Sequence, residues 1–263
     1  MSMKYRIMLA ALVILFFSSR PSPAQTDSAA SLPPKEREEL QARIYMARKD
    51  YLQAEKVYAQ LASEYPRDPT YPNAIGIAKQ QQDDLRGAAL YYQRAAKVDK
   101  KFATAYSNLG TIFYAQKQYT KAIAQYRKAI SVEPAVAGYY TNLGYAYFAQ
   151  KKFPQAYANF QKAMAINPNI FQENDRNGSV MTYQTVTNRG LFDFMLAKSY
   201  AQKADAMNCA VYLRKAHDEG YKPSEKDLVD KSFDSVRTDP DVKNVLDLMQ
   251  PPQKSASSAS PGG

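Results

Sequence analysis

A period of 34 residues is the feature that most constrains the fold of this chain. Eight positions keep their chemical type when the sequence is displaced by one period. Tyr106, Leu109, Gly110 and Phe113 recur as Tyr140, Leu143, Gly144 and Tyr147, and Ala122, Tyr126, Ala129 and Pro134 recur as Ala156, Phe160, Ala163 and Pro168. Repetition at a fixed period of about 20–50 residues indicates an array of identical units, each of which buries its apolar face against its neighbours.

The repetition divides residues 35–170 into four contiguous windows, 35–68, 69–102, 103–136 and 137–170. Each window contains two apolar stripes at helical spacing, separated by a polar turn such as residues 115–120. Pro134 and Pro168 end the second stripe before the next window begins. The first two windows keep part of the pattern, at Ala42, Tyr45, Ala54, Tyr58 and Pro66, and at Ile75, Gly76, Ala88, Tyr92 and Ala95. The windows therefore predict four helix pairs.

This pattern resembles the tetratricopeptide repeat, whose signature is aromatic-x2-Leu-Gly-x2-aromatic, then Ala-x3-aromatic, then Pro. Windows 103–136 and 137–170 match the signature almost fully. The first two windows depart from it, because Glu38 and Gln41 replace apolar residues, Lys79 replaces an aromatic residue and Lys100 replaces a proline. Terminal repeats often depart from the signature, since one of their faces meets solvent. The resemblance implies an all-helical array.

Two glycines inside predicted helices need a structural reason. Gly110 and Gly144 each cost their helix about 1 kcal/mol relative to alanine. Close approach of two helix backbones would compensate for this cost, and Ala122 and Ala156 are the small partners expected for it. The alternation of aromatic and small residues predicts a core of interlocking helices, which accounts for 21 Tyr in a chain without Trp.

The period breaks after residue 169 and resumes at residue 190. Residues 190–223 fit a fifth repeat-like helix pair, and residues 171–189 are a 19-residue insertion that is either a binding segment or a tolerated surface loop. Residues 224–249 have the pattern of capping helices, and residues 250–263 that of a disordered tail. The predicted fold class is all-α, a tetratricopeptide-repeat helical solenoid of about five helix pairs with a C-terminal helical cap.

The first 24 residues have the pattern of a signal peptide. Lys4 and Arg6 precede an apolar run over residues 7–17, and small residues at 22–24 predict cleavage before Gln25. The apolar run would span about 16 Å as a helix, half of the ~30 Å hydrocarbon core, so an uncleaved membrane anchor is the less favoured alternative. Residues 25–34 are a flexible leader. We expect a periplasmic or secreted protein.

Charge and cysteine content narrow the classes of partner. Cleavage would lower the formal net charge from +10 to +7. A basic chain is often a nucleic-acid binder, but export argues against that partner and favours acidic proteins or anionic surfaces. A single cysteine, Cys209, excludes an intramolecular disulfide and a four-cysteine zinc site.

No constellation of residues indicates catalysis. His217 is the only histidine, and it lies eight residues from Cys209 on one predicted helix, about 12 Å along the axis. A nucleophile and its base need contact at about 3 Å. The glycines are not spaced for a phosphate-binding loop. We therefore expect no enzymatic activity, no metal and no cofactor.

The family resemblance implies that the first helix of each pair lines a concave groove that binds peptides. Carried onto this sequence, the groove residues are Asn73, Ile77, Ser107, Asn108, Thr111, Tyr114, Thr141, Asn142, Tyr145 and Phe148, with Gln80, Phe194 and Lys198 beside them. Such a polar and aromatic lining suits an extended peptide or a partner helix. Tyr145 and Phe148 have an alternative role, which is to pack between repeats.

The sequence therefore predicts a non-enzymatic protein–protein interaction adaptor that holds a protein or peptide ligand in its groove, in envelope assembly or secretion. The alternative function is docking on anionic envelope polymers through a basic convex face. Residues 69–170 carry thirteen Lys and Arg against four acidic residues, most of them in turns or second helices. A plain solvated face would have the same composition. The sequence does not indicate the oligomeric state.

Overall fold

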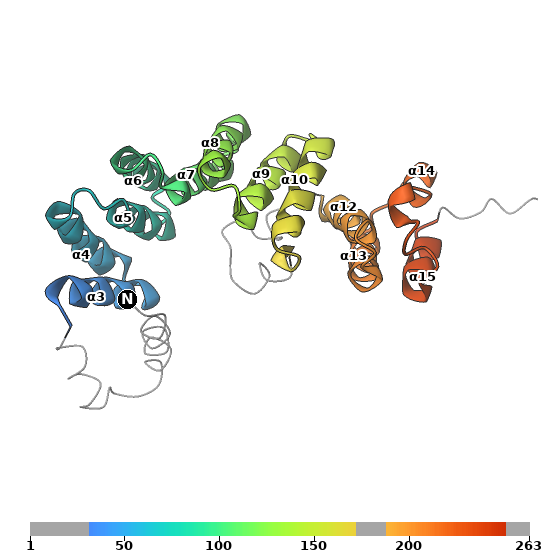
Figure 1. Ribbon diagram of the computed structural model, residues 1–263, viewed down its shortest axis with the longest axis horizontal. Helices are drawn as coiled ribbons and strands as arrows, with labels where there is room; N and C mark the ends of the chain where they lie inside the picture. The colour runs from blue at the N-terminus through green and yellow to red at the C-terminus, as the bar shows by residue number, and fades with distance from the viewer. Residues whose placement is uncertain (1–31, 172–187, 251–263) are drawn as a thin grey trace, which may run out of the picture. The chain divides into compact units, whose positions relative to one another are not determined.

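A computed structural model describes residues 32–171 and 188–250 of the chain (Figure 1). Within these residues the chain forms twelve α-helices and no strand, and the repeat helices are arranged as antiparallel pairs. The chain divides into two compact units, residues 1–134 and 135–263, called here the first and the second unit. The predicted all-helical repeat array is confirmed. The proposed signal peptide, most of the leader and insertion, and the tail lie outside the described residues.

The first unit consists of three helix pairs. Each helix packs against the next one along the chain, from α3 through to α8. The pairs are α3 (Pro34–Ala47) with α4 (Tyr51–Glu64), α5 (Thr70–Gln81) with α6 (Leu85–Val98), and α7 (Ala103–Ala115) with α8 (Tyr119–Val132). Small and aromatic side chains alternate in its core, where Ala42 and Ala54 are buried with Tyr58 and Tyr71.

The second unit contains two further pairs and a C-terminal segment. Its elements are α9 (Ala137–Ala149), α10 (Phe153–Ile166), α12 (Arg189–Ala201), α13 (Ala206–Asp218), α14 (Glu225–Leu228), the 3-10 helix η3 (Lys231–Phe233) and α15 (Pro240–Leu248). Helix α10 packs against both α9 and α12, although the 171–189 segment separates it from α12 in sequence. The stacking of pairs within this unit therefore continues across the insertion.

One left-handed residue marks the turn inside each pair. Positive φ angles of 56–62° occur at Lys49, Asp83, Lys117, Lys151 and Ala204. The first four are 34 residues apart, and Ala204 follows after one further period plus the 19 residues of the insertion. The residue after the turn caps the second helix in three pairs, where Asp50, Asp84 and Asp205 accept a hydrogen bond from a backbone N–H in the first turn. The turns place the fifth pair in the same register as the others.

An aromatic ring covers each signature glycine. A Cβ atom added at Gly76 or Gly110 would lie 2.6 Å from a ring carbon of Tyr92 or Tyr126, and one at Gly144 would meet Phe160. Ala122 and Ala156, the partners expected from the sequence, are buried, but the atoms nearest to these sites belong to the rings. Glycine is needed here because the partner helix presents a ring at the backbone itself.

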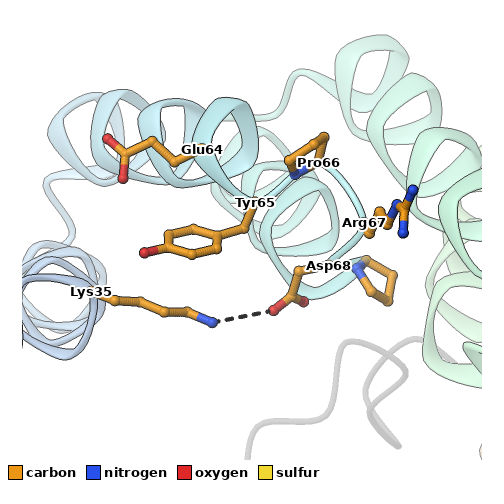
Figure 2. A pocket seen from close by; sticks show the side chains of 7 residues that line it. Lys35, Glu64, Tyr65, Pro66, Arg67 and Asp68 are labelled. Atoms are coloured by element: carbon orange, nitrogen blue, oxygen red, sulfur yellow. Dashed lines mark ion pairs between the residues drawn. The ribbon is translucent and has the colours of Figure 1, made fainter.

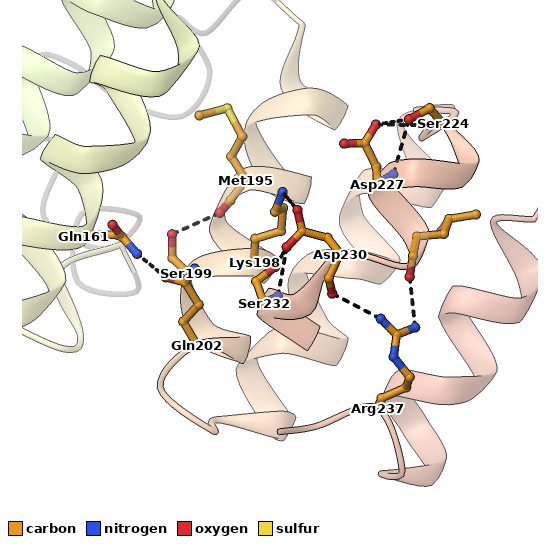
Figure 3. Close-up of polar contacts among 11 residues, drawn as sticks. Gln161, Met195, Lys198, Ser199, Gln202, Ser224, Asp227, Asp230, Ser232 and Arg237 are labelled. Carbon is orange, nitrogen blue, oxygen red and sulfur yellow. Dashed lines mark hydrogen bonds and ion pairs between the residues drawn. The ribbon is translucent and has the colours of Figure 1, made fainter. Parts of the chain in front are cut away.

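The C-terminal segment is fastened to the last helix pair by polar contacts (Figure 3). Asp230 accepts hydrogen bonds from Lys198 Nζ at 2.7 Å and from the hydroxyl of Ser232 at 2.6 Å. Arg237 donates to the carbonyl oxygens of Leu228 and Asp230. Helix α15 begins after Asp239, which caps it, and packs on α13. The C-terminal segment, which consists of α14, η3 and α15, therefore covers the last helix pair. It is the helical cap that the sequence predicted.

Partial burial raises the pKa of Asp230, but hydrogen bonds from Lys198 and Ser232 outweigh that effect and hold the pKa at about 2. The carboxylate is therefore charged throughout the neutral and mildly acidic range.

Within residues 32–171 and 188–250, no helix is both long enough and apolar enough to cross a bilayer.

Candidate functional site

Two asparagines link the first helices of neighbouring pairs in the first unit. Asn73 lies on α5 and Asn108 lies on α7, and Asn108 Nδ2 donates a hydrogen bond to Asn73 Oδ1 at 3.0 Å. Asn73 is buried, with 7% of its surface exposed, whereas Asn108 is half-buried. The contact fixes the amide of Asn108, while part of that side chain remains accessible to a ligand.

Ser107 and Thr111 serve the interior of the first unit. Both are buried, and Thr111 Oγ1 donates to the carbonyl oxygen of Ser107 at 3.2 Å. The same hydroxyl accepts a hydrogen bond from Tyr126 Oη at 3.3 Å. Burial raises the pKa of Tyr126, so that its hydroxyl stays a donor. These two groove candidates support the helix pair from inside.

Ile77 and Tyr114 are half-buried on α5 and α7. Tyr114 packs edge-to-face on Tyr119 with 5.3 Å between the ring centroids. Burial raises the pKa of Tyr114 to about 12, so the phenol is neutral and can donate a hydrogen bond. Gln80, which lies on α5 with Ile77, accepts a hydrogen bond from Tyr92 at 2.8 Å. Ile77, Asn108 and Tyr114 are thus the predicted groove residues of this unit that a ligand can reach.

The groove candidates on α9 are mostly core residues of the second unit. Thr141, Tyr145 and Phe148 are buried, with 1%, 3% and 6% of their surfaces exposed, and Asn142 is half-buried. Tyr145 stacks on Phe192 at 5.4 Å, and Phe148 meets the same ring edge-on at 5.8 Å. These two rings pack between pairs, which is the alternative role that the sequence left open.

The two groove candidates on α12 also have structural partners. Phe194 is buried against Tyr221 and Phe233, with ring centroids 5.2 and 5.8 Å apart. Lys198 is held by the carboxylate of Asp230 (Figure 3). The C-terminal segment therefore covers the part of α12 that the sequence assigned to the groove.

A surface depression of about 710 Å³ lies between α3 and the loop after α4 (Figure 2). Lys35 occupies its polar end, with Nζ 4.5 Å from the ring centroid of Tyr65 and 3.9 Å from Asp68 Oδ2. The ring of Tyr71 also lies near this ammonium, with its centroid at 5.6 Å. No pattern in the sequence predicts this arrangement, because Tyr65 and Tyr71 lie in the loop and helix after α4, far in sequence from Lys35. Lys35 therefore occupies the position beside these two rings that a cationic ligand would take.

Cys209 and His217 lie in different surroundings. Cys209 is buried, and burial raises the pKa of its thiol to about 12, which keeps it protonated and unreactive at neutral pH. His217 is exposed beside Asp218 at 3.5 Å. Among residues 32–171 and 188–250, no three His, Cys, Asp or Glu side chains gather as metal ligands would.

Three sequence matches identify the repeats. Residues 110–151 match the family described as TPR repeat, and residues 137–170 and 40–68 match families described as tetratricopeptide repeat. Residues 40–68 and 110–170 of the chain are tetratricopeptide repeats. Repeats of this family typically serve in protein–protein interaction adaptors rather than in catalysis, and the matching families include no enzyme family.

Two solved structures have a similar fold. A Pseudomonas aeruginosa pilF structure is 18% identical and covers 85% of this chain and 89% of its own, with a TM-score of 0.52. MamA from Desulfovibrio magneticus RS-1 is also 18% identical and covers 72% of this chain and 97% of its own, with a TM-score of 0.50. No curated protein matches the chain in sequence. At this level of identity the likeness concerns the fold alone.

Proposed function

We propose that this protein is a non-enzymatic adaptor that binds an extended peptide segment of a partner protein on the first-helix face of its repeats. The observation that carries the proposal is the Asn73–Asn108 pair, in which a buried amide orients a partly exposed one. A polar side chain held by a buried partner loses little conformational freedom when a ligand binds.

The chemistry of the oriented amide matches a peptide backbone. Asn108 uses one N–H to hold Asn73, and an asparagine amide has a second N–H and a carbonyl oxygen. A peptide unit offers one donor and one acceptor, so both remaining functions of the amide can be used by the same ligand residue. Such contacts to the main chain give affinity with little dependence on ligand sequence.

Apolar neighbours supply the rest of the contact. Ile77 lies one turn after Asn73 on α5, and Tyr114 lies on α7 with Asn108; both are half-buried. The Tyr114 phenol adds a donor to a flat apolar ring, a combination that is common in binding hot spots. Asn142 occupies the equivalent position of the next repeat, one period after Asn108, and is half-buried in the second unit. It is a separate candidate contact for a peptide on the second unit.

The adaptor is proposed to act outside the cytoplasm, as a periplasmic or secreted protein in envelope assembly or secretion. The support is the basic start, apolar run and small residues of positions 1–24. The intact mass of the protein recovered from its producing cell should correspond to a chain that starts at Gln25. Recovery of the full-length chain in the membrane fraction would instead favour the uncleaved anchor.

A matched pair of variants tests the binding face. Peptides are selected from a displayed random library on the wild-type protein, and their affinities are measured for Asn108→Ala and Asn73→Ala. Both variants lose the same intramolecular hydrogen bond, worth about 0.5–1.5 kcal/mol, but only Asn108 is accessible to a ligand.

We expect Asn108→Ala to weaken the selected peptides at least tenfold and Asn73→Ala to weaken them less than threefold. Circular dichroism should show the same helix content for both variants. Equal losses for both would mean that the pair acts only through stability, and wild-type affinity in a folded Asn108→Ala variant would remove the binding site from this face.

A further inference from the structure

Charge is divided unevenly along the first unit. Residues 32–84 contain eight Lys and Arg and nine Asp and Glu, so they are close to neutral. Residues 85–134 contain nine Lys and Arg and only two acidic residues, Asp99 and Glu133. The ion pairs described for the first unit are those of Lys35 and Lys79, both in the neutral half. Two acidic residues are too few to neutralise the basic half.

The basic residues occupy the two second helices of this half. Helix α6 carries three and helix α8 carries three, and neither helix contains an acidic residue. Both helices pack on α7. All six side chains are exposed: Arg86, Arg94, Lys97, Lys121, Arg127 and Lys128. This surface, called here the α6–α8 face, is distinct from the side chains of α5 and α7 that form the proposed peptide site.

Aromatic rings hold two of these ammonium groups at the surface. Lys121 Nζ lies 5.6 Å from the ring centroid of Phe113, and Lys128 Nζ lies 5.8 Å from that of Tyr106. The same arrangement recurs one period later in the second unit, where Lys162 lies 5.8 Å from the ring of Tyr140. Cation–π contacts of this kind limit the freedom of a lysine head group while leaving its charge accessible.

An exposed leucine lies within the basic stripe of α6. Leu90 has 64% of its surface exposed, and it lies four residues from Arg86 on one side and four residues from Arg94 on the other. Residues four apart share one face of a helix, so an apolar side chain projects between two guanidinium groups. A soluble anionic polymer would use only the cations, whereas an anionic bilayer offers phosphates to the cations and acyl chains to the leucine.

We propose that the α6–α8 face docks the protein on the surface of an anionic phospholipid bilayer. The cations attract the negatively charged head groups, at about fivefold in affinity for each Lys or Arg near the surface. Leu90 enters the boundary between head groups and acyl chains. This proposal does not depend on peptide binding by α5 and α7, since the two surfaces use different side chains.

Vesicle co-sedimentation tests the proposal with two double variants of the processed chain, which starts at Gln25. The probes are vesicles of phosphatidylcholine with 30% phosphatidylglycerol, compared with vesicles of phosphatidylcholine alone. Arg94→Gln with Lys128→Gln removes two charges from the α6–α8 face, and Arg43→Gln with Arg48→Gln removes two exposed charges from the neutral half. Every variant starts at Gln25, so the apolar run of residues 7–17 contributes no binding to either kind of vesicle.

We expect the first pair to lower binding to the anionic vesicles at least tenfold and the second pair to lower it less than twofold. Raising the salt from 0.05 to 0.3 M should also weaken binding, because screening shortens the range of the attraction. Equal losses for the two pairs, or equal binding to both kinds of vesicle, would overturn the proposal.

Leu90→Ser separates the bilayer from a soluble polyanion. Binding to anionic vesicles should fall several-fold, while binding to heparin should stay within twofold of the wild type. If vesicle binding does not change, the face recognises charge alone and the bilayer is not its ligand. Peptide affinity measured on the same variants should equal that of the wild type, so a failure here is distinguishable from a failure of the peptide site.

Discussion

Replacing Lys49 by glycine should stabilise the first helix pair. Lys49 lies in the turn between α3 and α4 with a φ angle of 60°. Its N–H donates to the carbonyl oxygen of Met46 at 3.1 Å, and the N–H of Asp50 donates to that of Tyr45 at 2.9 Å. These hydrogen bonds use only the backbone, so Lys49→Gly leaves them in place while it removes the Cβ atom that strains the left-handed conformation.

The magnitude follows from two opposing terms. A left-handed conformation costs a residue other than glycine about 1–2 kcal/mol, and the greater freedom of glycine in the unfolded chain costs about 0.5–1 kcal/mol. The net gain is about 0.5–1 kcal/mol. Lys56→Gly is the matched control, because Lys56 is an exposed residue inside α4. There the same change in charge and size should cost about 1 kcal/mol.

Urea unfolding followed by circular dichroism measures both variants, and hydrogen exchange of the α4 amides reports on the pair itself if it opens locally. The two variants should differ by about 1.5–2 kcal/mol, with opposite signs relative to wild type. If Lys49→Gly destabilises the pair as much as Lys56→Gly does, the left-handed turn contributes no strain and the reasoning is wrong.

Three further predictions concern the second unit. Gly144→Ala should destabilise the second unit by about 1–3 kcal/mol, because the added Cβ would meet the Phe160 ring. Gly138→Ala in the same helix meets open space and should stabilise the unit by up to about 1 kcal/mol. Thermal unfolding compares the two variants. Phe192→Ala should cost about 3–5 kcal/mol in urea unfolding because four rings pack on it, against less than about 0.5 kcal/mol for the exposed Met207→Ala. Asp230 has a pKa lowered from 3.8 to about 2, so it contributes stability above pH ~4 that is lost as the pH falls towards 2. Asp230→Asn should flatten that part of the pH profile, and an unchanged slope would show that other carboxylates cause it.

The sequence predicted the helix pairs because their period is carried by residues in direct contact. Gly110 packs against Tyr126, and one period later Gly144 packs against Phe160. The residues that repeat in the sequence are therefore the residues that contact each other. The sequence did not predict the left-handed turns. Glycine usually marks such a conformation, whereas lysine occupies these positions at Lys49, Lys117 and Lys151.

The candidate site was predictable only in part. Family position assigns a residue to the first helix but does not say what covers its side chain. Tyr145 and Phe148 are covered by Phe192, which follows the insertion, and Lys198 is held by Asp230 from the C-terminal segment. Phe192 and Asp230 each lie outside the repeat that contains the residues they contact. The contact of Asn108 with Asn73 joins neighbouring repeats in the same way, and a single window of sequence does not contain it.

The aromatic cluster around Phe192 should also allow the second unit to tolerate an inserted sequence between Phe171 and Phe192. Phe171 and Phe192 stand on either side of residues 172–187, and their ring centroids are 6.1 Å apart. The ends of any segment placed there are already held together by the core, so its length enters only through loop-closure entropy, at about 0.6 kcal/mol for each doubling. A fluorescent reporter or an affinity tag joined at this place should therefore leave α10 and α12 packed, which offers a way to label the second unit without changing a side chain of α5, α6, α7 or α8.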